Sequence, residues 1–343
     1  MPSVRNSRII FNEVPNDFPV PGKTVVYDES PQIDIDNIPL NGKVLVKTLV
    51  LSIDPYLRNR LRPADVPGYL PAFALGEPLL NFAVGVVVRS EKPDWQPGDL
   101  MYGAWGFQEY SIVEHHFMFR KIPRDEGIPL TQYVGVIGMP GKTAYSGWKE
   151  FSKAKKGETA FVSGASGAVG SFVVQLAKLD GLKVIACAGS DDKCDFVRSL
   201  GADVVFNYKK ESTEQVLKKH GPIDIFWDNV GGETLDLALA ACRSKGRLIE
   251  CGLISQYNDP DPYRLKNHIM IFEKSLTCVG FLVHTIEGSY SEQFYKEIPV
   301  LVKEGKFGFK EDISYGWESI GDAIVSVQRA TITGKKVVVV AKE

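Results

Sequence analysis

The chain has 343 residues, of which 44% are hydrophobic and 24% are charged, a composition typical of a folded globular protein of about two domains. Its formal net charge of −2 argues against binding to nucleic acid or to an anionic membrane, because proteins that do so usually carry a basic excess. Its five cysteines are irregularly spaced and form no Cys-x-x-Cys pair, which argues against a disulfide framework and a structural zinc site.

Neither a membrane anchor nor a secretion signal is apparent in the sequence. No apolar stretch reaches the roughly 20 residues that a membrane-spanning helix needs. Residues 1–10 lack the apolar centre of a signal peptide. We therefore expect a cytoplasmic protein.

Residues 1–125 are rich in strand-like segments. Residues 44–51 and 82–88 are apolar runs with many valines, and turn signals such as Asn41-Gly42 and Gln96-Pro97-Gly98-Asp99 punctuate this region. This pattern predicts a β-rich first domain.

From residue 156 onward, short apolar runs alternate with segments of helical length. We predict strands at residues 158–163, 183–188, 203–206, 224–228, 247–251 and 275–280, with helices at 170–179, 192–200, 213–220 and 233–241. Such alternation indicates βαβ units and a parallel sheet. Six strands fit the doubly wound, dinucleotide-binding Rossmann fold.

The C-terminal region contains a predicted helix at residues 292–304, then a second helix and an apolar strand at 336–340. An apolar last strand needs a sheet to join, and we expect it to return to the first domain. The predicted domains are therefore residues 1–125 with 300–343, and residues 126–299.

A glycine-rich loop at residues 163–170 connects the first strand and helix of the predicted parallel sheet. It has Ala165 where the usual dinucleotide fingerprint has its first glycine. Gly167 allows the backbone to approach a pyrophosphate, Gly170 allows the helix to pack closely on the strand, and the helix N-terminus offers free N–H groups. The alternative is an ordinary glycine turn, but the surrounding βα pattern favours a cofactor site.

The end of the second strand bears on the choice between NAD and NADP. It lacks the carboxylate that binds the ribose of NAD, and Ser190, Lys193 and Tyr208 instead supply a hydroxyl, a cation and a phenol suited to a 2′-phosphate. Asp191 and Asp192 would oppose a phosphate if they pointed inward, but they also suit the first turn of a helix. We predict NADPH; the alternative is that Ser190 only caps the helix and Lys193 is a solvated lysine.

Six motifs carry a resemblance to a known family. They are, in order, DPYLR at residues 54–58, GMPGKTAY at 138–145, SGASGAVG at 163–170, FNYK at 206–209, DNVGG at 228–232 and CGLISQYN at 251–258. From about residue 45 to the C-terminus, the chain resembles the zinc-independent medium-chain dehydrogenase/reductases. Within them it is similar to the NADPH-dependent alkenal/enone double-bond reductases, also called the leukotriene B4 dehydrogenase or prostaglandin reductase group.

The resemblance implies a GroES-like β-rich catalytic domain beside the Rossmann domain, and usually a homodimer. It also implies a role for individual residues: Ala168 and Val169 at the pyrophosphate; Gly189, Lys193 and Tyr208 at the 2′-phosphate; Asn229, Cys251, Phe281, Leu282 and Val283 along the nicotinamide half; Tyr257 facing cofactor and substrate; and Tyr56 with Pro55 in the substrate pocket. One departure stands out. The family often has Asn in an N-x-G-K element, whereas this chain has Ile332.

No catalytic metal is expected. The segment Leu75-Gly76-Glu77 lacks the histidine of the Gly-His-Glu element of zinc alcohol dehydrogenases, and residues 1–125 contain no cysteine. His115 and His116 are adjacent, so on a strand their side chains would point to opposite faces. We expect this pair to lie at the surface.

Reduction of an enal or enone requires a hydride at the β-carbon and a proton at the α-carbon. Negative charge develops on the carbonyl oxygen, and without a metal a tyrosine hydroxyl or a ribose hydroxyl of the cofactor must stabilise it by donating a hydrogen bond. Tyr257 is the first candidate, because it follows the end of the fifth strand, where open α/β sheets bind ligands. Tyr56 is the second and is better suited to a pocket wall with a polar tip. Packing roles for both tyrosines stay open, as does water or Tyr257 as the proton source.

Two other functions remain as alternatives to an enone reductase. An NADPH:quinone reductase of the same superfamily would act on quinones and not on enals. A cofactor-binding protein without turnover would bind NADPH, but no substrate would cause that NADPH to be oxidised.

Overall fold

The structure is a computed structural model that describes residues 3–114, 119–124 and 127–343. Its contacts divide it into two compact units, residues 1–135 with 311–343, and residues 136–310. Residues 126–135 thus belong to the first unit and residues 300–310 to the second, which places each boundary later in the chain than expected. His115 and His116 lie outside the described residues.

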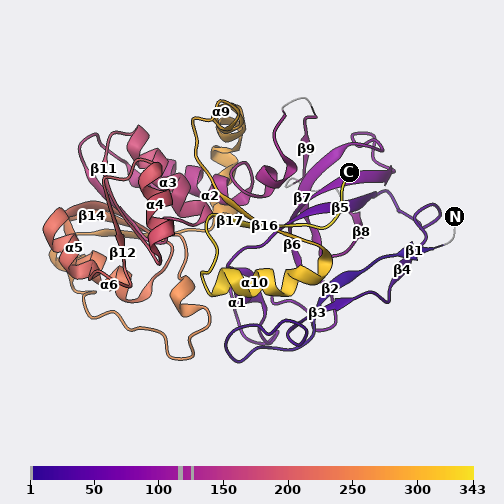
Figure 1. Ribbon diagram of the computed structural model, residues 1–343, viewed down its shortest axis with the longest axis horizontal. Helices are drawn as coiled ribbons and strands as arrows, with labels where there is room; N and C mark the ends of the chain where they lie inside the picture. Colours follow the sequence, from indigo (N-terminus) through magenta and orange to yellow (C-terminus); the bar gives the residue numbers. More distant parts are fainter. Residues whose placement is uncertain (1–2, 115–118, 125–126) are drawn as a thin grey trace. The chain divides into compact units, whose positions relative to one another are not determined.

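In the residues described, the first unit is built around a seven-stranded sheet of order β16-β17-β5-β6-β7-β9, with β8 paired to β5. Its elements are β1 (Val4–Arg5), β2 (Arg8–Phe11), β3 (Val25–Asp28), β4 (Gln32–Ile33), β5 (Val44–Ser52), α1 (Leu57–Arg60), β6 (Leu80–Ser90), β7 (Leu100–Gly106), β8 (Tyr110–Val113), β9 (Arg120–Ile122), the 3₁₀ turn η1 (Leu130–Val134), β16 (Glu311–Tyr315), the 3₁₀ turn η5 (Trp317–Ser319), α10 (Ile320–Gln328) and β17 (Lys335–Val339). The last strand, β17, runs antiparallel to β5 and parallel to β16. The C-terminal segment, yellow in Figure 1, therefore returns to the N-terminal strands, as the apolar last strand predicted.

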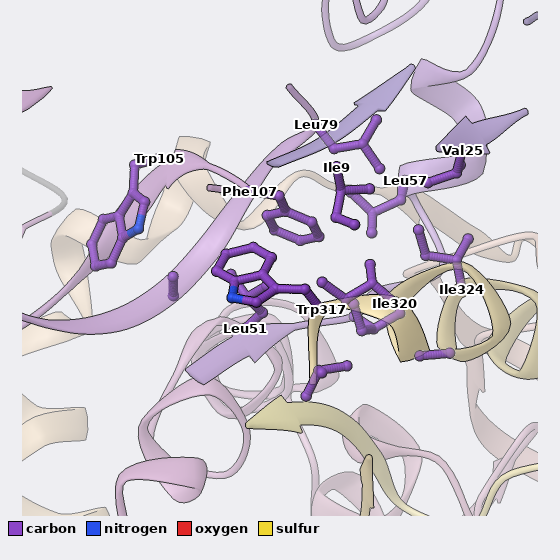
Figure 2. Close-up of a cluster of buried hydrophobic side chains, with 14 of the residues drawn as sticks. Ile9, Val25, Leu51, Leu57, Leu79, Trp105, Phe107, Trp317, Ile320 and Ile324 are labelled. Carbon is purple, nitrogen blue, oxygen red and sulfur yellow. The ribbon is translucent and has the colours of Figure 1, made fainter. Parts of the chain in front are cut away.

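The core of the first unit draws on both ends of the chain. Leu51 on β5 and Phe107 after β7 are fully buried in one cluster with Trp317 and Ile320. Figure 2 shows the side chains of Trp317 and Ile320 pointing toward Leu51 and Phe107. The unit therefore needs its C-terminal segment to complete its apolar interior.

The second unit contains, in the part described, a six-stranded parallel sheet of order β12-β11-β10-β13-β14-β15. Its elements are α2 (Met139–Gly147), the π-helical turn η2 (Trp148–Ser152), β10 (Thr159–Val162), α3 (Ala168–Leu179), β11 (Lys183–Ala188), α4 (Asp191–Ser199), β12 (Val204–Asn207), α5 (Thr213–His220), β13 (Ile223–Asp228), α6 (Gly232–Ala241), β14 (Cys242–Glu250), the 3₁₀ turn η3 (Ile254–Gln256), α7 (Met270–Glu273), β15 (Thr277–Gly280), α8 (Val283–Ile286), the 3₁₀ turn η4 (Glu287–Ser289) and α9 (Ser291–Lys303). The order corresponds to 3-2-1-4-5-6, the Rossmann arrangement. The predicted fold class, a Rossmann sheet plus a β-rich domain, is thus confirmed.

Aromatic and aliphatic side chains cover one face of this parallel sheet. Phe161 stacks on Phe226 at 5.0 Å between ring centroids and on Phe206 at 6.3 Å. Leu217 of α5 and Leu239 of α6 join the same buried cluster. Helices α5 and α6 therefore hold this face, and the loops at the strand ends are built on a rigid base.

In the part of the chain that the structure describes, no helix combines the length and the apolar character required to cross a membrane.

Candidate functional site

The loops that carry the predicted cofactor residues follow the carboxyl ends of parallel strands. Gly167 follows β10, Gly189 follows β11, Asn229 follows β13, Cys251 follows β14 and Phe281 follows β15. All carboxyl ends of a parallel sheet lie along one edge, where open α/β sheets bind their ligands. The fold therefore gathers these five residues along one edge of the second unit's sheet.

The glycine-rich loop brings the N-terminus of α3 close to the end of β10. A Cβ atom on Gly170 would lie 2.4 Å from the Gly164 carbonyl oxygen and 2.8 Å from the Ala165 Cα, so only glycine fits there. Gly167 is the N-cap of α3 in extended conformation, and its own Cβ would meet only the Gly164 oxygen, at 3.3 Å. The helix begins at Ala168, two residues before the predicted start. The backbone N–H groups of Ala168 and Val169 consequently lie in its first turn, where an anion is favoured.

The loop after β11 has the features of a phosphate pocket. The side chain of Lys193, in the first turn of α4, is 8% exposed, and burial together with the neighbouring Lys209 lowers the pKa of its ammonium group. A Cβ on Gly189 would lie 2.8 Å from the Tyr208 hydroxyl, so this phenol lies directly over the glycine. Ser190 precedes α4, but its hydroxyl makes no capping hydrogen bond, which weakens the alternative of a simple helix cap.

The nearby aspartate is held by partners of its own. Asp191 accepts hydrogen bonds from the side chains of Asn207 at 2.8 Å and Lys210 at 2.5 Å. These contacts lower the pKa of the Asp191 carboxyl, so it is ionised, and its charge is partnered by Lys210. Asp191 therefore repels a nearby phosphate less strongly than a carboxylate without a neighbouring cation would.

The observed donor set fits NADPH better than NADH. Gly189 lies under the Tyr208 phenol, and Ser190 and the buried Lys193 follow it in the chain. A 2′-phosphate accepts hydrogen bonds from ammonium, phenol and hydroxyl donors such as these. The residues that would hold this part of the cofactor are Gly189, Ser190, Lys193 and Tyr208.

Hydrogen bonds tie the loop after β13 to Ser163, the residue that follows β10. The buried Asp228 carboxylate accepts from Ser163 Oγ at 2.7 Å and from the backbone N–H of Gly231 at 3.0 Å. Asn229 donates through Nδ2 to the Ser163 carbonyl at 2.6 Å. Burial raises the pKa of the Cys251 thiol to about 12, so it stays protonated and suits a lining role rather than that of a nucleophile.

Aromatic packing holds the segment after β15. The ring of Phe281 lies 5.7 Å from Trp227 in an edge-to-face contact and 5.4 Å from Phe151. A Cβ on Gly147 would come within 2.4 Å of the Phe281 ring, so α2 approaches closely here. Leu282 and Val283 follow directly as the α8 N-cap and its first residue, both half-buried.

Tyr257 directly follows the short 3₁₀ turn η3, in the loop after β14. Its hydroxyl oxygen accepts a hydrogen bond from the Leu253 backbone N–H at 3.2 Å, and a Cβ on Gly252 would lie 3.3 Å from that oxygen. The phenol is therefore folded back over the end of β14. The contact with Leu253 uses a lone pair of the oxygen and not its hydrogen.

In the first unit, Tyr56 ends a buried polar chain that sequence reasoning did not find. Its half-buried side chain donates a short hydrogen bond from its hydroxyl to Asn81 Oδ1. Asn81 Nδ2 donates to Asp54 Oδ2 at 2.9 Å, and Lys335 Nζ donates to Asp54 Oδ1 at 2.6 Å. Ser52 Oγ also donates to Asp54, at 2.5 Å. Asp54 could have been noticed as the first residue of the DPYLR motif and Lys335 as the lysine after Gly334, but no local signal points to Asn81.

Two other sequence observations concern the first unit. Pro55, beside Tyr56, is exposed. Ile332, in the position where the family often has Asn, is partly buried against the core cluster of this unit. Its side chain thus contributes to packing.

Within the described residues, no group of three or more His, Cys, Asp or Glu side chains is arranged to hold a metal ion.

Known proteins similar to this chain cover nearly its whole length. Residues 9–121 match the family described as N-terminal domain of oxidoreductase, and residues 168–303 match the family described as Zinc-binding dehydrogenase. The 2-alkenal reductase (NADP(+)-dependent) of Nicotiana tabacum is 40% identical over 92% of this chain and 95% of its own. The (+)-pulegone reductase of Mentha piperita is 39% identical over 88% of this chain and 89% of its own.

A solved structure supports the same assignment. CurA from Vibrio vulnificus, in complex with NADPH, superposes with a TM-score of 0.90 at 28% identity, over 98% of this chain and 100% of its own. Fold, cofactor pocket and relatives agree on an oxidoreductase that uses NADPH. The chain belongs to the zinc-independent medium-chain dehydrogenase/reductase family, in the group of NADPH-dependent reductases that act on carbon–carbon double bonds.

Proposed function

We propose that this protein reduces the carbon–carbon double bond of α,β-unsaturated aldehydes and ketones, adding hydride to the β-carbon and a proton to the α-carbon without zinc. The observation that carries the proposal is the Tyr257 phenol, held at the end of β14 by Leu253 and beside Gly252. A phenol at the ligand-binding edge of the sheet suits a carbonyl oxygen that gains negative charge. NADPH supplies the hydride when it is bound.

The other proposed site residues bind different parts of the cofactor and the substrate. Gly167, Ala168 and Val169 receive the pyrophosphate, and Gly170 lets α3 pack close to the loop after β10. Asn229, Cys251, Phe281, Leu282 and Val283 line the nicotinamide half. Tyr56 and Pro55 contribute to substrate binding. Tyr257 donates a hydrogen bond to the substrate carbonyl and also faces the cofactor.

The test is a screen of NADPH oxidation against enals, enones, quinones and alcohols, with identification of the products. We expect saturated aldehydes and ketones from the enals and enones, with the carbonyl group intact. Turnover of quinones alone would replace the proposal with a quinone reductase. NADPH binding without oxidation by any of these compounds would indicate a binding protein.

We also propose that the protein forms a homodimer through the edge of the parallel sheet. β15 is the end strand of that sheet, and Thr277, Cys278 and Gly280 on it are exposed. An exposed edge strand offers unpaired backbone groups to a second chain. Light scattering coupled to size exclusion should report twice the chain mass for the parent. Val279→Pro should lower the measured mass to that of a single chain. A monomeric parent would contradict the proposal.

A further inference from the structure

A nearly buried ion pair joins α2 to the segment that follows β15. Lys142 Nζ, in α2, forms a salt bridge with the carboxylate of Glu287, at the start of η4, and the two side chains are 8% and 13% exposed. Both residues belong to the second unit, in which α2 packs against α3, α8 and α9. Neither residue is among those assigned to the cofactor or the substrate, so the proposed function leaves the pair without a role.

Two contacts attach the segment after β15 to α2. Phe281 is at one end, where a Cβ on Gly147 would come within 2.4 Å of its ring. Glu287 is at the other end, on Lys142. Lys142 and Gly147 are five residues apart, which is about 7.5 Å along a helix. Residues 281–287 therefore run alongside α2 in the opposite chain direction, with the rest of the proposed nicotinamide residues between the two attachments.

Other bonds to α2 and η2 hold the chain only after this segment has ended. The Tyr290 hydroxyl donates to Glu150 Oε2 at 2.5 Å, and the Tyr145 hydroxyl donates to Glu297 Oε2 at 2.8 Å. These two bonds hold α9 and the residue before it, and they do not act on α8. The position of α8 on α2 therefore depends on Phe281 at its start and on the ion pair at its end.

The ionic character of the second attachment matters for this position. Apolar contacts are not directional, so an aliphatic pair here would hold α8 against α2 in more than one register. A salt bridge joins one nitrogen to one carboxylate, and in a nearly buried place each charge is costly without the other. Fixing a register is the best-attested use of buried polar pairs.

We infer that Lys142 is a positioning residue, which through Glu287 fixes the register of residues 281–287 on α2 and thereby holds the nicotinamide ring of NADPH in place. The inference rests on the proposed function, which assigns Phe281, Leu282 and Val283 to the nicotinamide half. In this role Lys142 does not contact the cofactor, because its effect passes through Glu287 and α8.

The experiment compares two ligands that differ in the nicotinamide. 2′-Phospho-ADP-ribose has the adenosine, the 2′-phosphate and the pyrophosphate of NADPH but lacks the nicotinamide ring. Calorimetry gives the Kd of each ligand for the parent and for Lys142→Met, whose side chain is also unbranched. We expect the Kd of NADPH to rise about tenfold and that of 2′-phospho-ADP-ribose to change by less than about twofold. The emission of bound NADPH should also move toward that of the free cofactor, because the ring is less well shielded from water.

Lys149→Met is the matched control. Lys149 is exposed, and its ammonium lies 5.7 Å from the centre of the Tyr145 ring, so the same substitution there should leave both Kd values at the parental level. Glu287→Gln tests for rescue, because an amide oxygen still accepts a hydrogen bond from Lys142. It should retain more NADPH affinity than Glu287→Ala. If Lys142→Met does not fold, this second comparison still tests the inference.

Equal losses for both ligands in Lys142→Met would mean that this lysine acts on the fold or on the phosphates, and would overturn the inference. An unchanged Kd for NADPH would overturn it as well, as would equal Kd values for the two ligands in the parent. None of these measurements uses an enone. Failure of the proposed reduction would therefore be seen separately, in the NADPH-oxidation screen, and the binding comparison would still decide the inference.

Discussion

At the scale of single residues, two tyrosine hydroxyls with the same chemistry differ in how they are bonded. Tyr257 accepts a backbone N–H from Leu253, whereas Tyr56 gives its hydrogen to Asn81. Donation to a developing oxyanion requires a hydrogen, and the Leu253 contact does not use the one on Tyr257. Tyr257 is the residue to which we assign this stabilising role in the proposed function.

Tyr257→Phe should lower turnover on an enone by roughly 10²–10³-fold, the usual cost of losing one oxyanion donor. The charge is larger in the transition state than in the bound substrate, so kcat should fall more than substrate affinity. Tyr56→Phe should act more weakly and mainly through KM. Steady-state kinetics on both variants, with NADPH binding followed by fluorescence, gives the comparison. Parental turnover in Tyr257→Phe would reduce this tyrosine to a packing role.

Lys193→Ala should raise the KM for NADPH about 10–100-fold, because charge-assisted hydrogen bonds contribute ~1.5–3 kcal/mol. Kinetics with NADH should hardly change, since NADH has no 2′-phosphate. Lys209→Ala is a suitable control: Lys209 is exposed and lies close enough to affect the pKa of Lys193. Equal losses with both cofactors in Lys193→Ala would remove this lysine from phosphate binding.

Sequence reasoning proposed some candidate site residues and missed the buried polar chain of the first unit for a physical reason. Lys193 and Tyr257 stand at fixed distances from strands that have clear apolar patterns, so their positions could be predicted. Asn81 and Lys335 become significant only through Asp54, which lies 27 and 281 positions away from them in the chain. Contacts between such distant positions depend on the tertiary fold, and a single sequence does not display them.

At the scale of secondary-structure elements, two glycines of the glycine-rich loop are expected to have different roles, Gly170 in packing and Gly167 in cofactor binding. Gly170→Ala would place a methyl group against backbone atoms that cannot turn away, and overpacking of this kind costs typically 1–3 kcal/mol. Gly167→Ala meets only one atom, at 3.3 Å, so it should retain more stability and instead weaken NADPH binding. Urea denaturation and NADPH titration of both variants measure the two effects. Equal stability of the two variants would contradict the packing argument.

The elements themselves were predictable where burial leaves a pattern. All six strands of the parallel sheet were anticipated, and the signal is clearest in β10 and β11, which are buried on both faces and form apolar runs. β16 was not, because its sequence Glu-Asp-Ile-Ser-Tyr has neither an apolar run nor a clear alternation, and its residues are half-buried or exposed at the sheet edge. β14 also begins at Cys242, five residues before the predicted strand, in a polar stretch that gives no signal.

At the scale of the whole molecule, the first unit depends on the last residues of the chain. β17 pairs with β5 on one side and β16 on the other, and its Val337 and Val338 are fully buried. It also carries Lys335, the buried partner of Asp54. Removing one member of a buried ion pair alone costs about 3–5 kcal/mol, a large share of the ~5–15 kcal/mol that stabilises a typical domain.

A chain that lacks residues 335–343 should therefore lose the fold of its first unit and keep that of its second. Trp95, Trp105 and Trp317 lie in the first unit's core, so tryptophan emission should shift to longer wavelength. NADPH should still bind, because the predicted phosphate and nicotinamide residues all belong to residues 136–310. A chain that lacks only Glu343, an exposed residue paired with Arg124 at the surface, should match the parent in both measurements. Loss of NADPH binding together with the tryptophan shift would mean that the second unit does not fold without the first. An unshifted spectrum would mean that the first unit does not require its C-terminal strand.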